Sequence, residues 1–206
     1  MSTESLFRLS GWTCVAGGTA LIAQTLLHAS LPEGCVGQDC LTQDMRGTAA
    51  GEGPFAVASA VLLAMAAMSL VVLARRRRPL GKVGIAALVS AAGALGFGGA
   101  AAVTGAVDDD FSWMPLLVLP ALVLVVSTGI LVAVLVLRAR LIPTWLAVGV
   151  IASASLLLLA NEQTALVLLA VPFETMCVVV GLTLITRDRQ FLHNEQTQSA
   201  QLRGTQ

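Results

Sequence analysis

Residues 114–137 read MPLLVLPALVLVVSTGILVAVLVL, a run of 24 residues without a charged side chain. Because an α-helix rises about 1.5 Å per residue, about 20 such residues cross the roughly 30 Å hydrocarbon core of a bilayer. Five further stretches are similarly apolar, at 9–30, 55–74, 83–106, 143–160 and 164–186, and only one of them contains a charged residue. They are apolar on all sides, whereas barrel strands would alternate over segments of about 10 residues. The sequence therefore predicts an all-α, polytopic bundle of six transmembrane spans.

The composition supports one membrane domain and excludes an ordinary soluble one. Hydrophobic residues make up 56% of the 206 residues and charged residues only 12%, against about 25% charge in typical soluble domains. We expect a single domain over residues 1–186 and a polar tail over 187–206, flexible beyond a short helical extension. The connection at residues 161–163 is very short. If it did not turn, the span count would fall to five and the C-terminus would change sides.

The cations predict the orientation of the bundle. With the N-terminus in the cytoplasm, 11 of the 12 Lys and Arg residues lie on cytoplasmic segments, and only Arg46 lies outside. Cytoplasmic loops of membrane proteins carry such an excess of Lys and Arg. Both termini are therefore predicted to be cytoplasmic. The preference for Arg over Lys, with abundant Ala, Gly, Val and Leu, favours a bacterial cytoplasmic membrane.

Glu174 is the one charged residue inside a predicted span. It lies ten residues into the sixth span, about 15 Å along a helix and close to the bilayer midplane. A charge there costs about 2.5–3.5 kcal/mol on insertion scales, so the carboxyl is expected to be protonated, partnered or facing water. Ala170, Cys177 and Gly181 share its helical face and form a stripe of small residues. We therefore expect Glu174 to face a neighbouring helix.

Pro172 adds a second feature beside Glu174. A proline inside a helix removes one backbone hydrogen bond, which would free the carbonyl of Leu168. Carboxyl groups beside interrupted helices recur in the ion sites of transporters. The first interpretation is a proton or cation site at Glu174. The second is a neutral acid that bonds a neighbouring helix and has a purely structural role.

Two residues of the first span are candidate partners of this site. Gln24 and His28 are four residues apart and share a helical face, so they could form a polar path from the outer surface toward Glu174. In the alternative, Gln24 is an interhelical hydrogen-bonding residue and His28 a neutral imidazole in the surface layer.

The four cysteines fall into two groups. Cys35 and Cys40 lie in one external loop, where an oxidising compartment and the intervening Gly37 favour a disulfide. Cys14 and Cys177 are intramembrane and are expected to be small packing residues. We predict no metal site.

Small residues recur every four positions in the third span, at Ala92, Gly96 and Ala100. This spacing lets another helix approach closely. It is compatible with packing inside the chain or with a seam to a second copy.

These features leave two function classes. The first is a small proton- or cation-coupled transporter for a small molecule or ion that the sequence does not specify. The second is a non-catalytic membrane subunit or regulator that acts through helix–helix contacts, as a homodimer or with a partner membrane protein. Phosphate-binding loops, zinc-protease motifs and nucleophile elbows are missing from the sequence, so we predict no enzyme activity, no cofactor and no nucleic-acid partner. The bilayer is the one partner that the sequence requires.

Overall fold

The computed structural model describes residues 3–36, 46–77, 79, 81–107 and 115–203. Over these residues it is all-helical. Its elements are α1 (Thr3–Ala29), α2 (Glu52–Arg77), α3 (Gly81–Val107), α4 (Pro115–Arg138), α5 (Thr144–Leu156), the 3₁₀ turns η2 (Leu157–Leu159) and η3 (Ala165–Ala170), and α6 (Val171–Arg203).

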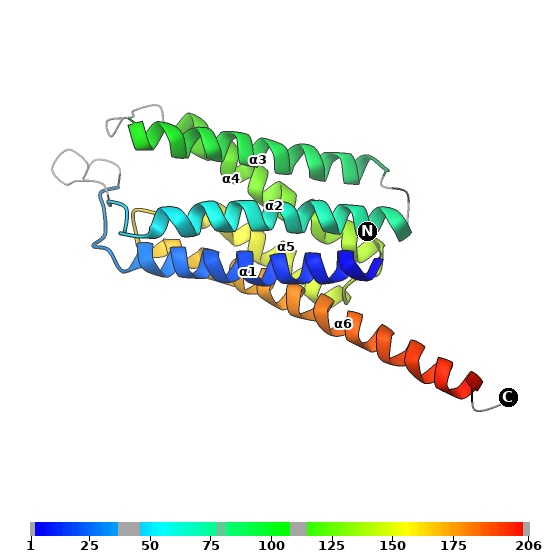
Figure 1. Ribbon diagram of the computed structural model, residues 1–206. Coiled ribbons are helices and arrows are strands. Elements are labelled where there is room, and N and C mark those ends of the chain that lie inside the picture. Colours follow the sequence, from blue (N-terminus) through cyan, green and yellow to red (C-terminus); the bar gives the residue numbers. More distant parts are fainter. Residues whose placement is uncertain (1–2, 37–45, 78, 80, 108–114, 204–206) are drawn as a thin grey trace.

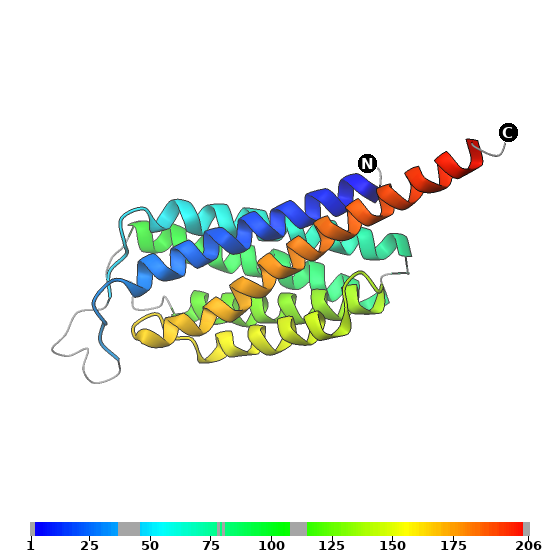
Figure 2. The same ribbon diagram turned by 90° about the horizontal axis from the view of Figure 1, so that it is seen from below.

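Consecutive helices run in opposite directions along one bundle (Figure 1). Within the described residues, α1, α2, α3, α4 and the helix that runs through η3 into α6 are long and apolar enough to cross a membrane. The first turn of α1 and the last turn of α6 lie at the same end of the bundle (Figures 1 and 2). We call this end the arginine end and the opposite one the His28 end.

The α1 helix packs between α2 and α6, and α6 crosses it obliquely (Figure 2). Glycines bring the backbones of α1 and α6 together. A Cβ atom placed on Gly181 would lie 2.5 Å from the carbonyl oxygen of Gly11, and one on Gly18 would lie 2.9 Å from the carbonyl oxygen of Glu174. Side chains larger than hydrogen would therefore push the two helices apart.

This packing predicts opposite effects for two glycine substitutions. Gly181→Ala is expected to lower the free energy of unfolding in detergent micelles by about 1–3 kcal/mol, because the added methyl meets backbone atoms that cannot move away cheaply. Gly96→Ala is the matched control, because a Cβ there meets nothing within 4 Å. Since alanine favours a helix over glycine by about 1 kcal/mol, this control should be neutral or stabilising. Equal losses in both variants would contradict the observed α1–α6 contact.

A polar contact also joins α1 to α2 inside the bundle. Ser10 Oγ donates to Ser69 Oγ over 2.8 Å, and both residues are buried. Ser10 Oγ also lies 2.7 Å from the carbonyl oxygen of Leu6. The surrounding core is apolar, with Leu73, Leu146 and Leu184 fully buried.

The short connection before the sixth helix does turn, and local hydrogen bonds explain why. Asn161 Oδ1 accepts from the backbone N–H of Gln163 over 2.9 Å. Thr164 then caps η3 by accepting from the N–H of Leu166. Asn and Thr side chains stabilise turns and helix starts in this way.

The fifth helix is shorter than the span predicted at 143–160. The 13 residues of α5 and three of η2 give a length of about 25 Å, less than a bilayer core. The backbone at Pro143, the first residue of the predicted span, is extended and not helical. The last turn of the fifth helix is the 3₁₀ turn η2. The other five predicted spans each correspond to a helix of adequate length.

At the arginine end, α6 continues past the predicted span. Arg187 Nη1 donates to the carbonyl oxygen of Leu141 over 2.8 Å and so ties α6 to the turn between α4 and α5. The helix then runs to Arg203 and extends beyond the bundle (Figure 1). The tail predicted at 187–206 is thus largely helical over its described part, and its flexibility stays a prediction.

Candidate functional site

Glu174 lies at the interface between α1 and α6, as its stripe of small neighbours predicts. Its side chain is only 2% exposed. Thr25 Oγ1, from α1, donates to Glu174 Oε1 over 2.5 Å. The carboxyl is therefore oriented by a hydroxyl of the neighbouring helix.

The second carboxyl oxygen has a different environment. Glu174 Oε2 is buried, and among the described residues it has no hydrogen-bond partner. A buried polar atom left unsatisfied costs about 1–3 kcal/mol. Such groups are rare in folded proteins and call for a functional or structural explanation.

The carboxyl is directed toward the His28 end. The backbone carbonyl of Glu174 is level with Gly18, whereas its side chain reaches Thr25, seven residues further along α1. Thr25 lies four residues before the end of α1 at Ala29, about 6 Å along the helix axis. The carboxyl group therefore lies about one helical turn inside the bundle from the end of α1 at Ala29. This position is nearer the His28 end than the bilayer midplane that the sequence predicts.

The prediction that Pro172 frees the carbonyl of Leu168 was wrong. The helix changes at this point from 3₁₀ to α geometry, and α6 begins at Val171. The N–H of Val171 donates to the carbonyl oxygen of Leu168. Pro172 is thus in the first turn of α6, where its missing N–H leaves no gap.

The structure separates the two candidate partners of Glu174. Gln24 is half-buried, and no described hydrogen bond joins it to Glu174 or His28. Thr25, which the sequence reasoning missed, occupies the position expected of Gln24. The sequence does mark Thr25 by a seven-residue spacing, because Gly11, Gly18 and Thr25 all face α6.

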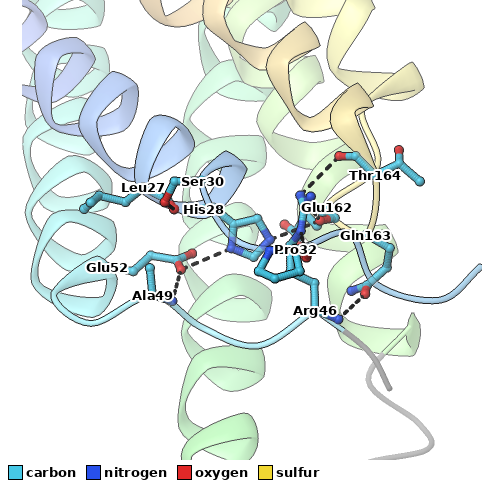
Figure 3. A network of polar contacts seen from close by, with 10 residues as sticks. All are labelled: Leu27, His28, Ser30, Pro32, Arg46, Ala49, Glu52, Glu162, Gln163 and Thr164. Carbon is cyan, nitrogen blue, oxygen red and sulfur yellow. Dashed lines mark hydrogen bonds and ion pairs between the residues drawn. The ribbon is translucent and has the colours of Figure 1, made fainter. Parts of the chain in front are cut away.

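His28 lies in a separate polar cluster at the His28 end (Figure 3). Its Nδ1 lies 3.1 Å from Glu52 Oε2, at the start of α2, and its Nε2 lies 3.1 Å from the carbonyl oxygen of Glu162. The residue is 8% exposed. It thus connects the end of α1 to α2 and to the connection between α5 and α6.

Arg46 belongs to the same cluster. Its Nε donates to the carbonyl oxygen of Pro32 over 2.9 Å, and its Nη1 donates to those of Glu162 and Thr164 over 3.0 and 3.2 Å. Its backbone N–H donates to Gln163 Oε1 over 2.7 Å. A buried guanidinium therefore holds the α1–α2 loop against the 161–164 connection (Figure 3).

Two further bonds close the same contact. The N–H of Gly34 donates to the carbonyl oxygen of Gln163 over 2.8 Å, and the N–H of Ala165 donates to Glu33 Oε1 over 3.1 Å. We call His28, Arg46, Glu52 and the carbonyl of Glu162 the clasp, because they join three separate segments of the chain.

The predicted packing residues have different surroundings. Gly181 is buried against α1, and Ala170 packs against the core. Ala92, Gly96 and Ala100 are exposed on α3, so this stripe does not serve packing within the chain. Gly93, one position along, meets Leu124 of α4 instead.

The cysteines also differ in their positions. Cys14 and Cys177 are free thiols in the α1–α6 region, buried and half-buried respectively. Cys35 is 2% exposed, and Cys40 lies outside the described residues. The Cys35–Cys40 disulfide therefore stays a prediction. Among the described residues, no group of three His, Cys, Asp or Glu side chains could hold a metal ion.

Compared with protein-family models, curated proteins and solved structures, the chain shows no significant match. Its function must therefore be argued from the geometry of Glu174 and the clasp.

Proposed function

We propose that the chain is a six-span protein of a bacterial cytoplasmic membrane and that Glu174 exchanges a proton, or a cation in its place, during coupled transport. Both termini are then cytoplasmic, and the His28 end faces outward. The charge distribution supports this orientation. Exposed arginines gather at the arginine end, at Arg75, Arg76, Arg77, Arg138 and Arg140, whereas Glu33, Glu52 and Glu162 lie at the His28 end.

The observation that carries the proposal is the half-satisfied carboxyl of Glu174. A residue that served only to bind α1 and α6 together would be expected to use both oxygens, because a buried polar atom without a partner is destabilising. Glu174 instead keeps one buried oxygen that bonds no group in the described part of the chain. An acid in this state can take up and release a proton without breaking its bond to Thr25.

A labelling experiment tests this proposal without knowledge of the substrate. A hydrophobic carbodiimide reacts with protonated carboxylic acids in apolar surroundings. In membranes, we expect it to modify Glu174 and to modify it less as the pH rises. Glu4, a half-exposed acid paired with Arg8 at the arginine end, is the comparison group, and Glu4→Gln should leave the labelling unchanged.

A transport measurement extends the test to function. Small molecules and ions are screened in proteoliposomes that contain a pH-sensitive dye. Those that drive proton movement in the unmodified protein are expected to drive none in Glu174→Gln at equal membrane abundance. Undiminished coupled flux in that variant would refute the role of Glu174.

A second candidate function rests on the exposed face of α3. Ala92, Gly96 and Ala100 leave this face smooth, and nothing within 4 Å would meet a Cβ at Gly96. A non-catalytic subunit or regulator would use such a face to bind a partner helix. Gly96→Leu is then expected to leave the bundle folded and to abolish a complex that co-purifies with the unmodified protein. A complex that survives this change would argue against the face as an interface.

The proposed external location of the His28 end also predicts the redox state of its cysteines. Of the four cysteines, two are expected to react with a thiol reagent in denaturant before reduction and all four after it. Mass spectrometry distinguishes these products. Four reactive thiols before reduction would exclude the Cys35–Cys40 disulfide.

A further inference from the structure

The turn between α4 and α5, at the arginine end, has a well-defined backbone geometry. The N–H of Arg140 donates to the carbonyl oxygen of Leu137 over 2.9 Å, and the N–H of Leu141 donates to that of Val136 over 2.9 Å. These two bonds form a Schellman motif, in which the first residue beyond the helix cap takes a left-handed conformation. Arg140 is that residue, with a φ of 53°. Leu141 and Val136 are buried in the core, so the turn is held in place on both sides.

Arginine is an unexpected residue at this position of the turn. Glycine is the usual one, because a residue with a side chain is strained in the left-handed region. Within the described parts of the chain, Arg140 is the one residue other than glycine with a positive φ. The arginine end does not need it as a source of positive charge, since Arg75 and Arg77 lie in the last turn of α2. The strained position of Arg140 therefore calls for a role of its side chain.

Two further cations lie at the same turn. Arg138 is the last residue of α4, and Arg187 Nη1 donates to the carbonyl oxygen of Leu141 over 2.8 Å. Arg138 and Arg140 are exposed, and in the described part of the chain neither guanidinium has a protein partner. Two guanidinium groups are thus open to a ligand, beside a third positive charge. Because the planar guanidinium binds phosphate oxygens through two parallel N–H bonds, the matching ligand chemistry is a phosphate.

The residues that follow the turn favour a lipid as the source of this phosphate. Trp145, in the first turn of α5, is 63% exposed, and tryptophan is enriched at the headgroup level of bilayers. Val148 is 55% exposed, and Ala152 is exposed one turn further on. Their spacings of three and four residues place all three on one face of α5. An acyl chain can lie along such an apolar face, whereas a free phosphate ion gains nothing from it.

We infer that the α4–α5 turn binds the headgroup of one anionic phospholipid. Arg138 and Arg140 bind its phosphate, Arg187 adds positive charge, and Trp145 begins the face of α5 along which an acyl chain lies. This site goes beyond the proposed role of Glu174 and does not depend on it, because that carboxyl lies nearer the His28 end.

Lipid titration followed by native mass spectrometry of the whole chain in detergent tests the site. Phosphatidylglycerol is expected to bind more tightly than phosphatidylcholine, whose headgroup has no net charge. Arg140→Gly should weaken phosphatidylglycerol binding at least about tenfold, as for the loss of a hydrogen bond to a charged group. The unfolding temperature of this variant should stay the same or rise, because glycine removes the strain. Unchanged binding of phosphatidylglycerol in Arg140→Gly would overturn the inference.

Two further variants separate a built site from diffuse attraction. Arg75→Gln removes one exposed charge from α2 and should weaken binding by less than about fivefold, the effect of one cation near an anionic surface. Arg140→Asn should match Arg140→Gly, because asparagine also tolerates the left-handed conformation and carries no charge. Equal weakening by Arg75→Gln and Arg140→Asn would show that the arginine end attracts lipids without a specific site.

Inorganic phosphate distinguishes the two sources of the ligand chemistry. In excess, it should leave phosphatidylglycerol bound, because it lacks the acyl chains. Displacement of the lipid by phosphate, or equal affinity for phosphatidylcholine, would contradict a lipid site.

Tryptophan fluorescence locates the bound lipid. The chain has three tryptophans, so Trp12→Phe combined with Trp113→Phe leaves Trp145 alone. Phosphatidylglycerol with brominated acyl chains should quench Trp145 at lower lipid concentrations than in the same background with Arg140→Gly. Identical quenching in both proteins would contradict the placement of the lipid at this turn.

Discussion

Arg46→Gln is expected to lower the free energy of unfolding by about 3 kcal/mol or more, because three carbonyl acceptors lose a charged donor at a buried position. The residue is 9% exposed, and its side chain contacts the carbonyl oxygens of Pro32, Glu162 and Thr164. Glutamine is shorter and cannot reach all three. Denaturant titration in detergent micelles measures the effect.

Arg138→Gln is the control for this prediction. Arg138 is exposed at the arginine end, and substitutions at such positions usually change stability by less than about 0.5 kcal/mol. Similar values for the two variants would mean that the clasp contributes nothing to the stability of the bundle. If Arg46→Gln alone destabilises the protein, amide exchange in that variant should also be accelerated more at Gly34 and Ala165 than within α3.

The second large effect is a coupling between Thr25 and Glu174. Thr25→Val removes the one described donor to the carboxyl and is expected to destabilise the bundle by about 1–2 kcal/mol, the upper range for hydrogen bonds between membrane helices. Glu174→Met is expected to stabilise it by about 1–3 kcal/mol, because it removes a half-satisfied buried acid.

The double variant completes the cycle. In the Glu174→Met background, Thr25→Val should be nearly neutral, so the two changes are not additive. Additive effects would show that the hydroxyl and the carboxyl act independently. A destabilising Glu174→Met would show that the acid is structural glue and would favour the second interpretation of this residue.

The helices could be predicted from the sequence because each apolar run, with at most one charged residue, is longer than a soluble helix needs. The inward orientation of Glu174 was likewise predictable, since Ala170, Cys177 and Gly181 mark the face on which another helix can approach. The shortening of the fifth span was not, because it depends on the extended backbone at Pro143 and on the 3₁₀ turn that ends the helix, and neither leaves a clear mark in the apolar run.

The partner of Glu174 was misplaced for a simple geometric reason. The sequence favours Gln24 because of its polarity and its four-residue spacing from His28. The face of α1 that contacts α6 instead follows the seven-residue spacing of Gly11, Gly18 and Thr25, which lies about 100° away from Gln24 on the helix. The positions of Gly11 and Gly18 in the sequence therefore indicate which face of α1 contacts α6.

The clasp could not be predicted from sequence patterns. Arg46 is the one Lys or Arg residue that the sequence predicts to lie outside the cytoplasm, and the sequence gives it no role there. Its partners lie 14 to 118 residues away in the chain, and most are backbone carbonyls, which leave no mark in the sequence. His28 was predicted to be a neutral surface imidazole or part of a path to Glu174, and its contact with Glu52 likewise depends on the folded loop.

Infrared spectroscopy of the carboxyl group of Glu174 tests the central claim most directly. A protonated carboxylic acid in an apolar site has a carbonyl absorption distinct from that of a carboxylate, and the absorption shifts when its proton exchanges for deuterium. We expect such a band in the unmodified protein, its loss in Glu174→Gln, and its shift after transfer to heavy water. A spectrum in which Glu174→Gln removes no protonated-acid band, or removes one that never shifts in heavy water, would contradict an exchangeable proton at Glu174.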